Sequence, residues 1–280
     1  MPIRVTSIQR GCVYDGPGVR TTIFLKGCTM HCPWCCNPET IKSEQQYFVE
    51  DDKCLYLKGT ESVICKNCVR TGGAKLEKEC PFGVKTPVSQ EYTCEELYHQ
   101  LEVDFTLMQS SNGGITFSGG EPLLQIDELE QLLSYIKDEG INIAFETTLF
   151  SNTESLQKAL PYADIMIIDI KFQPQHPLYK SSSYIQKLSA HIKICRSNHK
   201  PVLFRMVFTD DMMGDVSYIV DSLRLLNVDS IELLKCHNLG AKKYQMLKIA
   251  NDDYSASYEC MYHFSQVLSH NDIQVSMLIV

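Results

Sequence analysis

The strongest constraint on the fold is a regular alternation of short apolar runs and amphipathic stretches from residue 113 onward. Each run is rich in β-branched or aromatic residues and is apolar on successive positions, which is typical of parallel strands buried on both faces. The stretches between the runs have helical spacing. The predicted strands cover residues 114–117, 141–145, 163–169, 202–208 and 230–234.

Helices and flanking strands complete a repeating pattern. The predicted helices cover residues 127–139, 153–160, 184–198 and 215–226. One more strand at 21–25 precedes them, and a last helix at 254–270 leads to a final strand at 273–279. Six β/α units predict an α/β protein with a partial (β/α)6 parallel barrel, or open half-barrel, within one domain over residues 1–280. In such barrels the chemistry lies at the carboxyl ends of the strands.

Composition and charge exclude several classes of protein. Hydrophobic residues make up 44% and charged residues 21% of the chain, as in ordinary globular proteins. A net charge of −8 argues against a general nucleic-acid partner. Without an apolar run of about 18 residues we expect no membrane span. The N-terminus lacks the apolar stretch of a secretory signal, so a cytoplasmic location is expected.

Cysteine is the unusual component, with 13 in 280 residues. In a reducing compartment, clustered cysteines indicate metal binding or catalysis rather than disulfides. Five lie between positions 28 and 54, and three more follow at positions 65, 68 and 80. We expect the other five to be small buried hydrophobic residues. These five are Cys12, Cys94, Cys195, Cys236 and Cys260.

The first cysteine motif directly follows the strand predicted at 21–25. Cys28, Cys32 and Cys35 have the spacing C-x3-C-x2-C. Three thiolates on one tight loop can hold three irons of a 4Fe–4S cubane and leave the fourth iron open. An open iron can bind a substrate and pass it an electron, whereas structural four-ligand sites are closed. The alternative is a zinc loop that borrows Cys36 or His31; we expect Cys36 to be a non-ligand neighbour.

A glycine-rich turn follows the strand predicted at 114–117. Gly119 and Gly120 let the backbone approach a ligand closely, and Glu121 can accept a hydrogen bond from an ammonium group. In isolation the same residues are compatible with a plain tight turn.

Charged residues end the next two strands. Glu146 and Thr147 end the strand at 141–145, and Asp169 and Lys171 end the strand at 163–169. A carboxylate two residues from a lysine places both on one side of a strand, where they can hold a carboxylate ligand or a small cation. The alternative is a surface ion pair.

Residues 47–90 interrupt the alternation with four cysteines and no persistent strand or helix pattern. We interpret them as an inserted loop-rich module that is held by metal rather than by a core. Its cysteines, which include one C-x2-C pair and a Cys-Pro pair, fit either a second 4Fe–4S cluster or a zinc knuckle. They are Cys54, Cys65, Cys68 and Cys80.

The cysteine loop and the strand-end motifs together resemble the radical S-adenosylmethionine superfamily. The resemblance implies that the methionyl amine and carboxylate of S-adenosylmethionine chelate the open iron. One-electron reduction then releases a 5′-deoxyadenosyl radical. The resemblance also implies that Trp34 lies beside the adenine and that the turn at 119–122 contacts the methionyl amine. Arg205 and His237 match further positions near the cofactor.

Residues 15–21, Asp-Gly-Pro-Gly-Val-Arg-Thr, narrow the resemblance to glycyl-radical-enzyme activating enzymes. In that family Glu146, Asp169 and Lys171 would surround the methionyl carboxylate and a monovalent cation. The radical abstracts hydrogen from a glycine Cα of a partner glycyl radical enzyme, and Asp15 would lie near that glycine. Asp15 and Lys171 are therefore the predicted catalytic residues. The chain departs from the family pattern after residue 146, where a usual glycine is missing.

Two further expectations follow from this resemblance. The insertion resembles the ferredoxin-like cluster modules of some activating enzymes, and the low-potential electron implies a flavodoxin or ferredoxin as reductant.

One competing hypothesis is a radical enzyme that modifies a small molecule or a ribosomal peptide. Another is an electron-transfer or metal-binding module without catalysis, against which the motifs at 119–122 and 169–171 argue.

Overall fold

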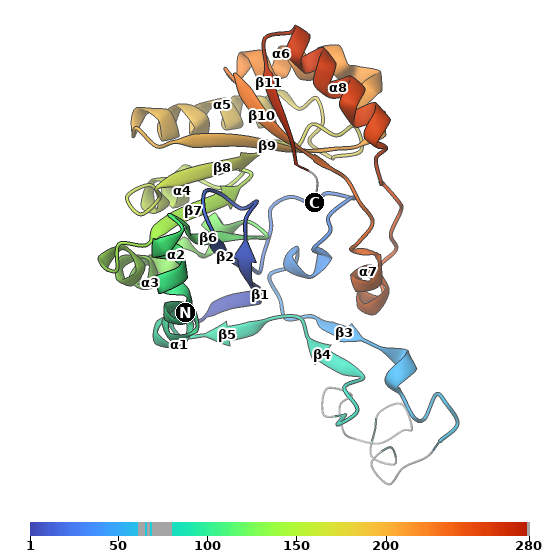
Figure 1. Ribbon diagram of the computed structural model, residues 1–280. Coiled ribbons are helices and arrows are strands. Elements are labelled where there is room, and N and C mark those ends of the chain that lie inside the picture. Colours follow the sequence, from blue (N-terminus) through green and yellow to red (C-terminus); the bar gives the residue numbers. More distant parts are fainter. Residues whose placement is uncertain (61–64, 66–67, 69–79, 279–280) are drawn as a thin grey trace.

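The computed structural model describes residues 1–60, 65, 68 and 80–278. Nine strands of this described part form one curved sheet (Figure 1). Listed from edge to edge, the strands are β11 (Gln274–Leu278), β10 (Ser230–Lys235), β9 (Val202–Phe208), β8 (Ile165–Asp169), β7 (Asn142–Thr147), β6 (Gly114–Gly119), β2 (Arg20–Leu25), β1 (Ile3–Cys12) and β5 (Gln90–Tyr92).

Parallel pairing joins the neighbouring strands β2, β6, β7, β8, β9, β10 and β11. The prediction of six parallel β/α units is confirmed, and β11 occupies the place of the expected final strand. β1 and β5 add an antiparallel edge that was not predicted. Because these strands are parallel, the carboxyl ends of β2, β6, β7, β8, β9 and β10 lie at one rim of the half-barrel. The motifs of the sequence meet at this rim.

Except for α7 (Ala241–Leu247), the helices cover the outer side of the curved sheet, and the blue segment that follows β2 lies on its other side (Figure 1). The predicted helices are confirmed as α3 (Ile126–Asp138), α4 (Thr153–Ala159), α5 (Ser182–Ser197), α6 (Val216–Leu225) and α8 (Tyr258–His270). Three short helices were not predicted: α1 (Cys94–Leu101), α2 (Phe105–Ser110) and α7 (Ala241–Leu247). None of the helices within the described ranges has the length and apolarity needed to cross a membrane.

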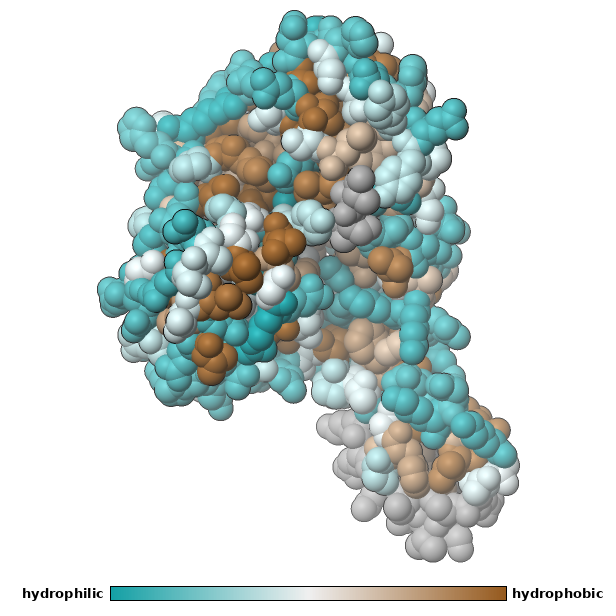
Figure 2. Space-filling model, viewed as in Figure 1, coloured by the Kyte–Doolittle hydropathy of each residue, from teal (hydrophilic) through white to brown (hydrophobic). Residues whose placement is uncertain are grey.

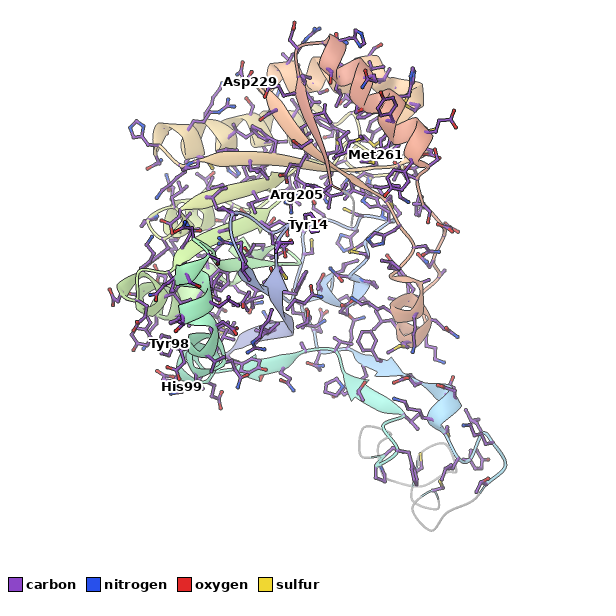
Figure 3. All side chains as sticks on the ribbon, in the orientation of Figure 1. Tyr14, Tyr98, His99, Arg205, Asp229 and Met261 are labelled. Carbon is purple, nitrogen blue, oxygen red and sulfur yellow. The ribbon has the colours of Figure 1, made fainter. Side chains whose placement is uncertain are left out.

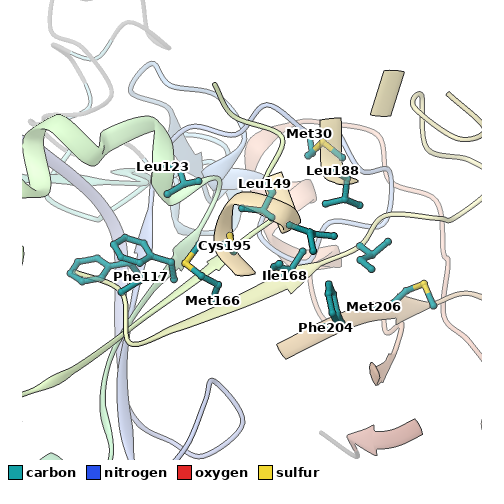
Figure 4. Packing of buried hydrophobic residues seen from close by; sticks show 14 of the residues in the cluster. Met30, Phe117, Leu123, Leu149, Met166, Ile168, Leu188, Cys195, Phe204 and Met206 are labelled. Carbon is teal, nitrogen blue, oxygen red and sulfur yellow. The ribbon is translucent and has the colours of Figure 1, made fainter. Parts of the chain in front are cut away.

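The core lies between the parallel strands and the outer helices (Figure 4). Phe117 and Phe145 stack across β6 and β7 with their ring centroids 5.6 Å apart. Met166 and Ile168 of β8 pack near Cys195 of α5, and all three are fully buried (Figure 4). Continuous burial on both faces is why these strands read as unbroken apolar runs in the sequence.

The scattered cysteines follow their expectation only in part. Cys195 and Cys236 are buried and pack as small hydrophobic residues, as predicted. The expectation is wrong for Cys12, Cys94 and Cys260, which are half-buried. They lie at the end of β1 and at the starts of α1 and α8, where one side of the chain faces solvent.

The cysteine-rich insertion projects away from the half-barrel (Figures 1 and 2). Two short antiparallel strands, β3 (Tyr47–Val49) and β4 (Lys85–Pro87), close its base, so the expectation of no regular element is wrong there. Cys54 is buried, as is Cys65, while Cys68 and Cys80 are half-buried. Part of the module that the sequence assigns to 47–90 falls outside the described residues.

Candidate active site

The cysteine loop begins directly after β2 and is closed at its base by the backbone. Hydrogen bonds of 2.7 and 2.9 Å join the N–H groups of residues 27 and 28 to the carbonyl groups of residues 40 and 41. Between these bonds the chain turns back through a short 3-10 helix, η1 (Pro38–Thr40). The turn keeps Cys28, Cys32 and Cys35 together at the rim of the half-barrel.

The three thiols share a buried, sulfur-rich environment. Burial raises the pKa of Cys28 to about 12 and that of Cys32 to about 11. Burial, and then the neighbouring Cys36 and Cys32, raises the pKa of Cys35 well above its usual value. No three His, Cys, Asp or Glu side chains of the described residues form a ready site for a single metal ion. A cubane instead takes three thiolates on three different irons, and these thiols supply that donor set.

Lys171 and Asp169 form a buried ion pair at the end of β8. The exposed fractions of their side chains are 10% and 18%, so the pair is not the surface ion pair that the motif also allowed. Burial opposes the charge of Lys171, but Asp169 and then Cys32 more than compensate and raise its pKa. The second carboxylate oxygen of Asp169, Oδ1, is buried without a hydrogen-bond partner among the described residues.

Arg205 on β9 ties neighbouring strands to the N-terminal segment. Its guanidinium donates to Glu146 of β7 at 2.7 Å and to Glu232 of β10 at 2.8 Å. It also donates to the backbone oxygen of Tyr14, which lies next to Arg205 in Figure 3. Burial raises the pKa of Glu146, but Arg205 reverses this effect and holds the pKa below its usual value. Arg205, which is 3% exposed, therefore acts on the site through carboxylates.

Glu121 is fully buried, and its carboxylate is held by the chain itself. It accepts hydrogen bonds from the hydroxyls of Thr147 (2.5 Å) and Thr148 (2.7 Å). The backbone N–H groups of Thr148 (3.0 Å) and Leu123 (3.3 Å) supply two more. Burial raises the pKa of Glu121. Since four bonds fill the usual acceptor sites of a carboxylate, an ammonium ligand here would have to displace one of them.

The threonines that hold Glu121 directly follow residue 146, where the family pattern has a glycine that this chain lacks. Leu149 adopts a φ of +55°, in the left-handed region where side chains are strained. Its N–H donates to the Thr147 hydroxyl at 2.9 Å, and its carbonyl oxygen accepts from Nδ1 of His191 at 2.8 Å. The chain thus keeps a glycine-like turn with a leucine, and two side chains stabilise it.

The glycine turn before Glu121 approaches the cysteine loop rather than open space. A Cβ atom on Gly119 would lie 2.2 Å from the backbone nitrogen of Leu25, and one on Gly120 would lie 2.0 Å from the carbonyl oxygen of Gly27. Gly120 and Glu121 donate backbone hydrogen bonds to the same two residues at 2.9 and 2.7 Å. The glycines were expected to serve a ligand, and the structure adds that they fix the base of the loop.

Replacing Gly120 with alanine is expected to destabilise the cysteine loop. The new methyl group would lie 2.0 Å from the backbone oxygen of Gly27, and a backbone atom cannot rotate out of the way as a side chain can. We therefore expect the unfolding free energy to fall by about 3 kcal/mol or more. Gly214→Ala is the matched control, because a Cβ there meets nothing within 4 Å. Denaturant unfolding and iron content after reconstitution measure the effect. Equal stability of the two variants would contradict the proposed packing.

A pocket that is open to solvent lies beside Trp34. Trp34 and Tyr254 meet edge to face with ring centroids 6.4 Å apart, and His237 also lines the space. The side-chain amides of Asn251 and Asn238, joined by a 2.9 Å hydrogen bond, form part of the wall. Aromatic faces and amide groups together suit a planar heterocycle that carries donors and acceptors at its edge.

Asp15 and Arg20 have different surroundings although they share one motif. The Asp15 carboxylate accepts from the Thr22 hydroxyl at 2.5 Å, lies 4.0 Å from the guanidinium of Arg205 and stays 22% exposed at the mouth. Arg20 is fully buried and donates to the Thr116 hydroxyl at 2.6 Å. Arg20 therefore anchors the turn to β6, while Asp15 is accessible from the open side.

The sequence did not reveal that α7 supports the cysteine loop. Lys243 donates to Asn37 and Glu39, each at 2.6 Å, and Tyr244 donates to the backbone oxygen of Cys35 at 2.9 Å. These contacts join residues about two hundred positions apart, and no local motif marks them. His176, whose ring centroid lies 5.7 Å from that of Trp34, was also missed.

Known proteins resemble this chain over most of its length. A family model described as a 4Fe-4S single cluster domain matches residues 14–189, more than half of the chain. The (2S)-3-sulfopropanediol dehydratase activating enzyme of Klebsiella oxytoca is 31% identical, over 87% of this chain and 84% of that protein. The choline trimethylamine-lyase activating enzyme of Oleidesulfovibrio alaskensis is 30% identical, over 87% and 86%.

One solved structure supports the architecture. A radical SAM methyltransferase from Sphaerobacter thermophilus superposes with a TM-score of 0.54 at 14% identity, over 99% of this chain and 76% of that one. This likeness concerns the fold alone.

A single-cluster 4Fe–4S domain, together with these two relatives, defines the class, the radical S-adenosylmethionine enzymes. The cofactors of this class are a 4Fe–4S cluster and S-adenosylmethionine. Within it, the chain belongs to the activating enzymes of glycyl radical enzymes, like the two relatives named above.

Proposed function

We propose that Cys28, Cys32 and Cys35 hold the 4Fe–4S cluster and that its open iron binds S-adenosylmethionine. When bound and reduced by one electron, the cofactor supplies a 5′-deoxyadenosyl radical and methionine. One observation carries this proposal: three cysteines on one loop, of which one is buried and two are half-buried, lie near the charged Lys171 and the pocket beside Trp34 at the same barrel rim.

Different residues orient the two ends of S-adenosylmethionine. The Lys171 ammonium, which stays charged, binds the methionyl carboxylate. The turn formed by Gly119, Gly120 and Glu121 faces the methionyl amine, with Glu121 exchanging a threonine hydroxyl for the ammonium group. Trp34 and His237 bind the adenine in their shared pocket.

A monovalent cation binds beside the Lys171–Asp169 pair. The buried Oδ1 atom of Asp169 lacks a hydrogen-bond partner among the described residues, and an oxygen of this kind suits a hard cation. Glu146 on the adjacent strand β7 supplies a further carboxylate on this side of the site. Arg205 keeps that carboxylate ionised.

The radical passes to a partner protein at the open side of the half-barrel. The 5′-deoxyadenosyl radical takes a hydrogen atom from a glycine Cα of a glycyl radical enzyme and leaves as 5′-deoxyadenosine. Asp15, which is part-exposed at this mouth, positions the backbone of the partner's glycine loop. The named relatives support this partner class, because they activate a sulfopropanediol dehydratase and a choline trimethylamine-lyase.

An anaerobic activation assay tests this function. The cluster-loaded protein is incubated with S-adenosylmethionine, a low-potential reductant and a glycyl radical enzyme encoded beside it. Electron paramagnetic resonance should show the doublet of a glycyl radical on the partner. Cleavage of S-adenosylmethionine without this doublet would instead favour a small molecule or a ribosomal peptide as the substrate.

The cysteine-rich module binds a second 4Fe–4S cluster through Cys54, Cys65, Cys68 and Cys80. The Cys68 N–H donates to the Cys65 carbonyl oxygen at 3.0 Å in a tight turn. A Cys-x2-Cys turn of this kind suits the ligand spacing of ferredoxins, as it does that of zinc sites.

Metal analysis separates these two possibilities. Anaerobically reconstituted protein is expected to contain about eight irons and eight sulfides per chain, since each cubane holds four. A Cys65→Ser/Cys68→Ser variant should fall to about four irons and keep the ability to cleave S-adenosylmethionine with dithionite. About four irons together with one zinc in the unmodified protein would contradict the second cluster.

The electron donor and the cellular location follow from the same chemistry. We propose a flavodoxin or ferredoxin as the reductant, because reductive cleavage needs a low-potential, one-electron donor. The location is cytoplasmic, where thiols remain reduced and available as cluster ligands.

A further inference from the structure

His176 occupies a buried position next to Trp34 without an evident structural partner for one ring nitrogen. It lies in the turn after β8 and is 3% exposed. Its backbone N–H donates to the carbonyl oxygen of Gln173 at 2.9 Å, which fixes the turn. Its ring is tilted by 58° against the ring of Trp34, with the centroids 5.7 Å apart.

The hydrogen bonds of His176 determine where the ring carries its proton. The backbone N–H of Leu178 donates to Nδ1 at 3.0 Å, so Nδ1 is the unprotonated nitrogen. In a neutral imidazole the other nitrogen then carries the hydrogen, and Nε2 is a donor. Nε2 is buried and has no hydrogen-bond partner among the described residues. Leaving a buried donor unsatisfied is unfavourable, and native structures rarely do so without a functional reason.

A second buried histidine shows that this fold can satisfy an imidazole completely. His191 on α5 is 2% exposed. Its Nδ1 lies 2.8 Å from the carbonyl oxygen of Leu149, and its Nε2 lies 3.0 Å from the hydroxyl of Thr153. Both nitrogens are therefore paired. Among the buried histidines of the described residues, the open donor is found in His176, whose ring packs near that of Trp34.

The same turn leaves an acceptor open as well. The side-chain amide of Gln173 donates to the backbone oxygen of Val207, which fixes its orientation. Its Oε1 atom is buried and lacks a hydrogen-bond partner in the part of the chain that is described. One short turn thus holds an unused donor and an unused acceptor, as expected of a segment that meets a polar ligand.

We propose that the Nε2–H group of His176 donates a hydrogen bond to the nucleoside part of S-adenosylmethionine. This inference rests on the proposed function, which places the cofactor beside Trp34. A nucleoside offers ribose oxygens and ring nitrogens as acceptors, and its base suits the aromatic pocket. The methionyl end is directed elsewhere, toward Lys171 and the open iron. His176 is then a contact residue for the cofactor rather than a packing residue.

Replacing His176 with phenylalanine tests this contact, because the ring stays and the donor is lost. We expect the dissociation constant of S-adenosylmethionine to rise about tenfold, the worth of one such hydrogen bond. Isothermal titration calorimetry on the anaerobic protein with its oxidised cluster measures this constant. Binding of 5′-deoxyadenosine should weaken by the same factor. The melting temperature without cofactor should fall only by what the lost bond from the Leu178 N–H to Nδ1 contributes, because the Nε2 donor that is also removed has no partner among the described residues.

Two further variants keep the test decisive. His176→Gln retains an amide donor and should restore part of the affinity. His191→Phe, the matched control, should lower the melting temperature and leave the affinity for 5′-deoxyadenosine unchanged, because His191 supports the turn at the methionyl end of the site. If His176→Phe lowers the melting temperature and binds the cofactor normally, Nε2 serves structure or an internal water and the proposal is wrong. Unchanged 5′-deoxyadenosine binding would also overturn it. Failure of the unmodified, cluster-loaded protein to bind S-adenosylmethionine would reject the proposed function itself.

Discussion

Replacing Cys28 with serine is expected to abolish cleavage of S-adenosylmethionine and to remove the iron of the first cluster. The loop offers three cysteine ligands in the proposed site, so the loss of one leaves two iron atoms without protein ligands in place of one. A serine hydroxyl is a poor substitute, because iron–sulfur clusters are held by soft thiolates. We expect 5′-deoxyadenosine formation to fall to background, by more than about 100-fold.

Cys36→Ser is the matched control, because Cys36 is adjacent to the third ligand but is not proposed to bind the cluster. It is exposed at the surface of the loop, unlike its three neighbours. We expect this variant to keep its iron content and most of its activity. Iron analysis and chromatography of 5′-deoxyadenosine measure both variants. Equal losses for Cys36→Ser and Cys28→Ser would show that the ligand set has been assigned wrongly.

The second large effect is expected from Arg205→Leu, which removes the positively charged guanidinium at the centre of the rim. Glu146, Glu232 and the Tyr14 carbonyl would lose their shared donor. Removing one partner of a buried ion pair costs about 3–5 kcal/mol, since the remaining charge stays desolvated. The same change frees the segment that carries Asp15, so activation of the partner should fall more than cleavage of S-adenosylmethionine.

Arg205→Lys provides the comparison for this result. A lysine keeps the charge but cannot donate to three acceptors in a fixed planar arrangement. We expect an intermediate stability in denaturant unfolding. If Arg205→Leu unfolded at the same denaturant concentration as the unmodified protein, the Arg205 network would contribute no stability and this interpretation of the rim would fail.

The parallel half-barrel could be predicted because its central strands are buried on both faces. Burial of this kind leaves continuous apolar runs, as in β8 and β9, which are easily read from a sequence. The strands β1 and β5 lie at an exposed antiparallel edge, and their mixed composition hides them. Helix α1 carried a readable signal, the capping box of Thr93 and Glu96, which was overlooked.

The site was predictable where its residues are close in sequence, and less so where it depends on tertiary pairing. The cysteine spacing and the Asp169–Lys171 pair are local patterns. The contact of Arg205 with Glu232 depends on the register between β9 and β10. The saturation of Glu121 by two threonines and the open Nε2 of His176 likewise exist only once the strand ends have met.

Isotope transfer from the partner is the most direct measurement of the central claim. The glycyl radical enzyme is produced with glycine that carries two deuterium atoms at Cα, and is then activated anaerobically. The 5′-deoxyadenosine that forms should contain one deuterium for each glycyl radical, because the hydrogen abstracted comes from that carbon. Unlabelled 5′-deoxyadenosine at full yield, with no glycyl radical on the partner, would contradict the claim that this chain installs the radical on glycine.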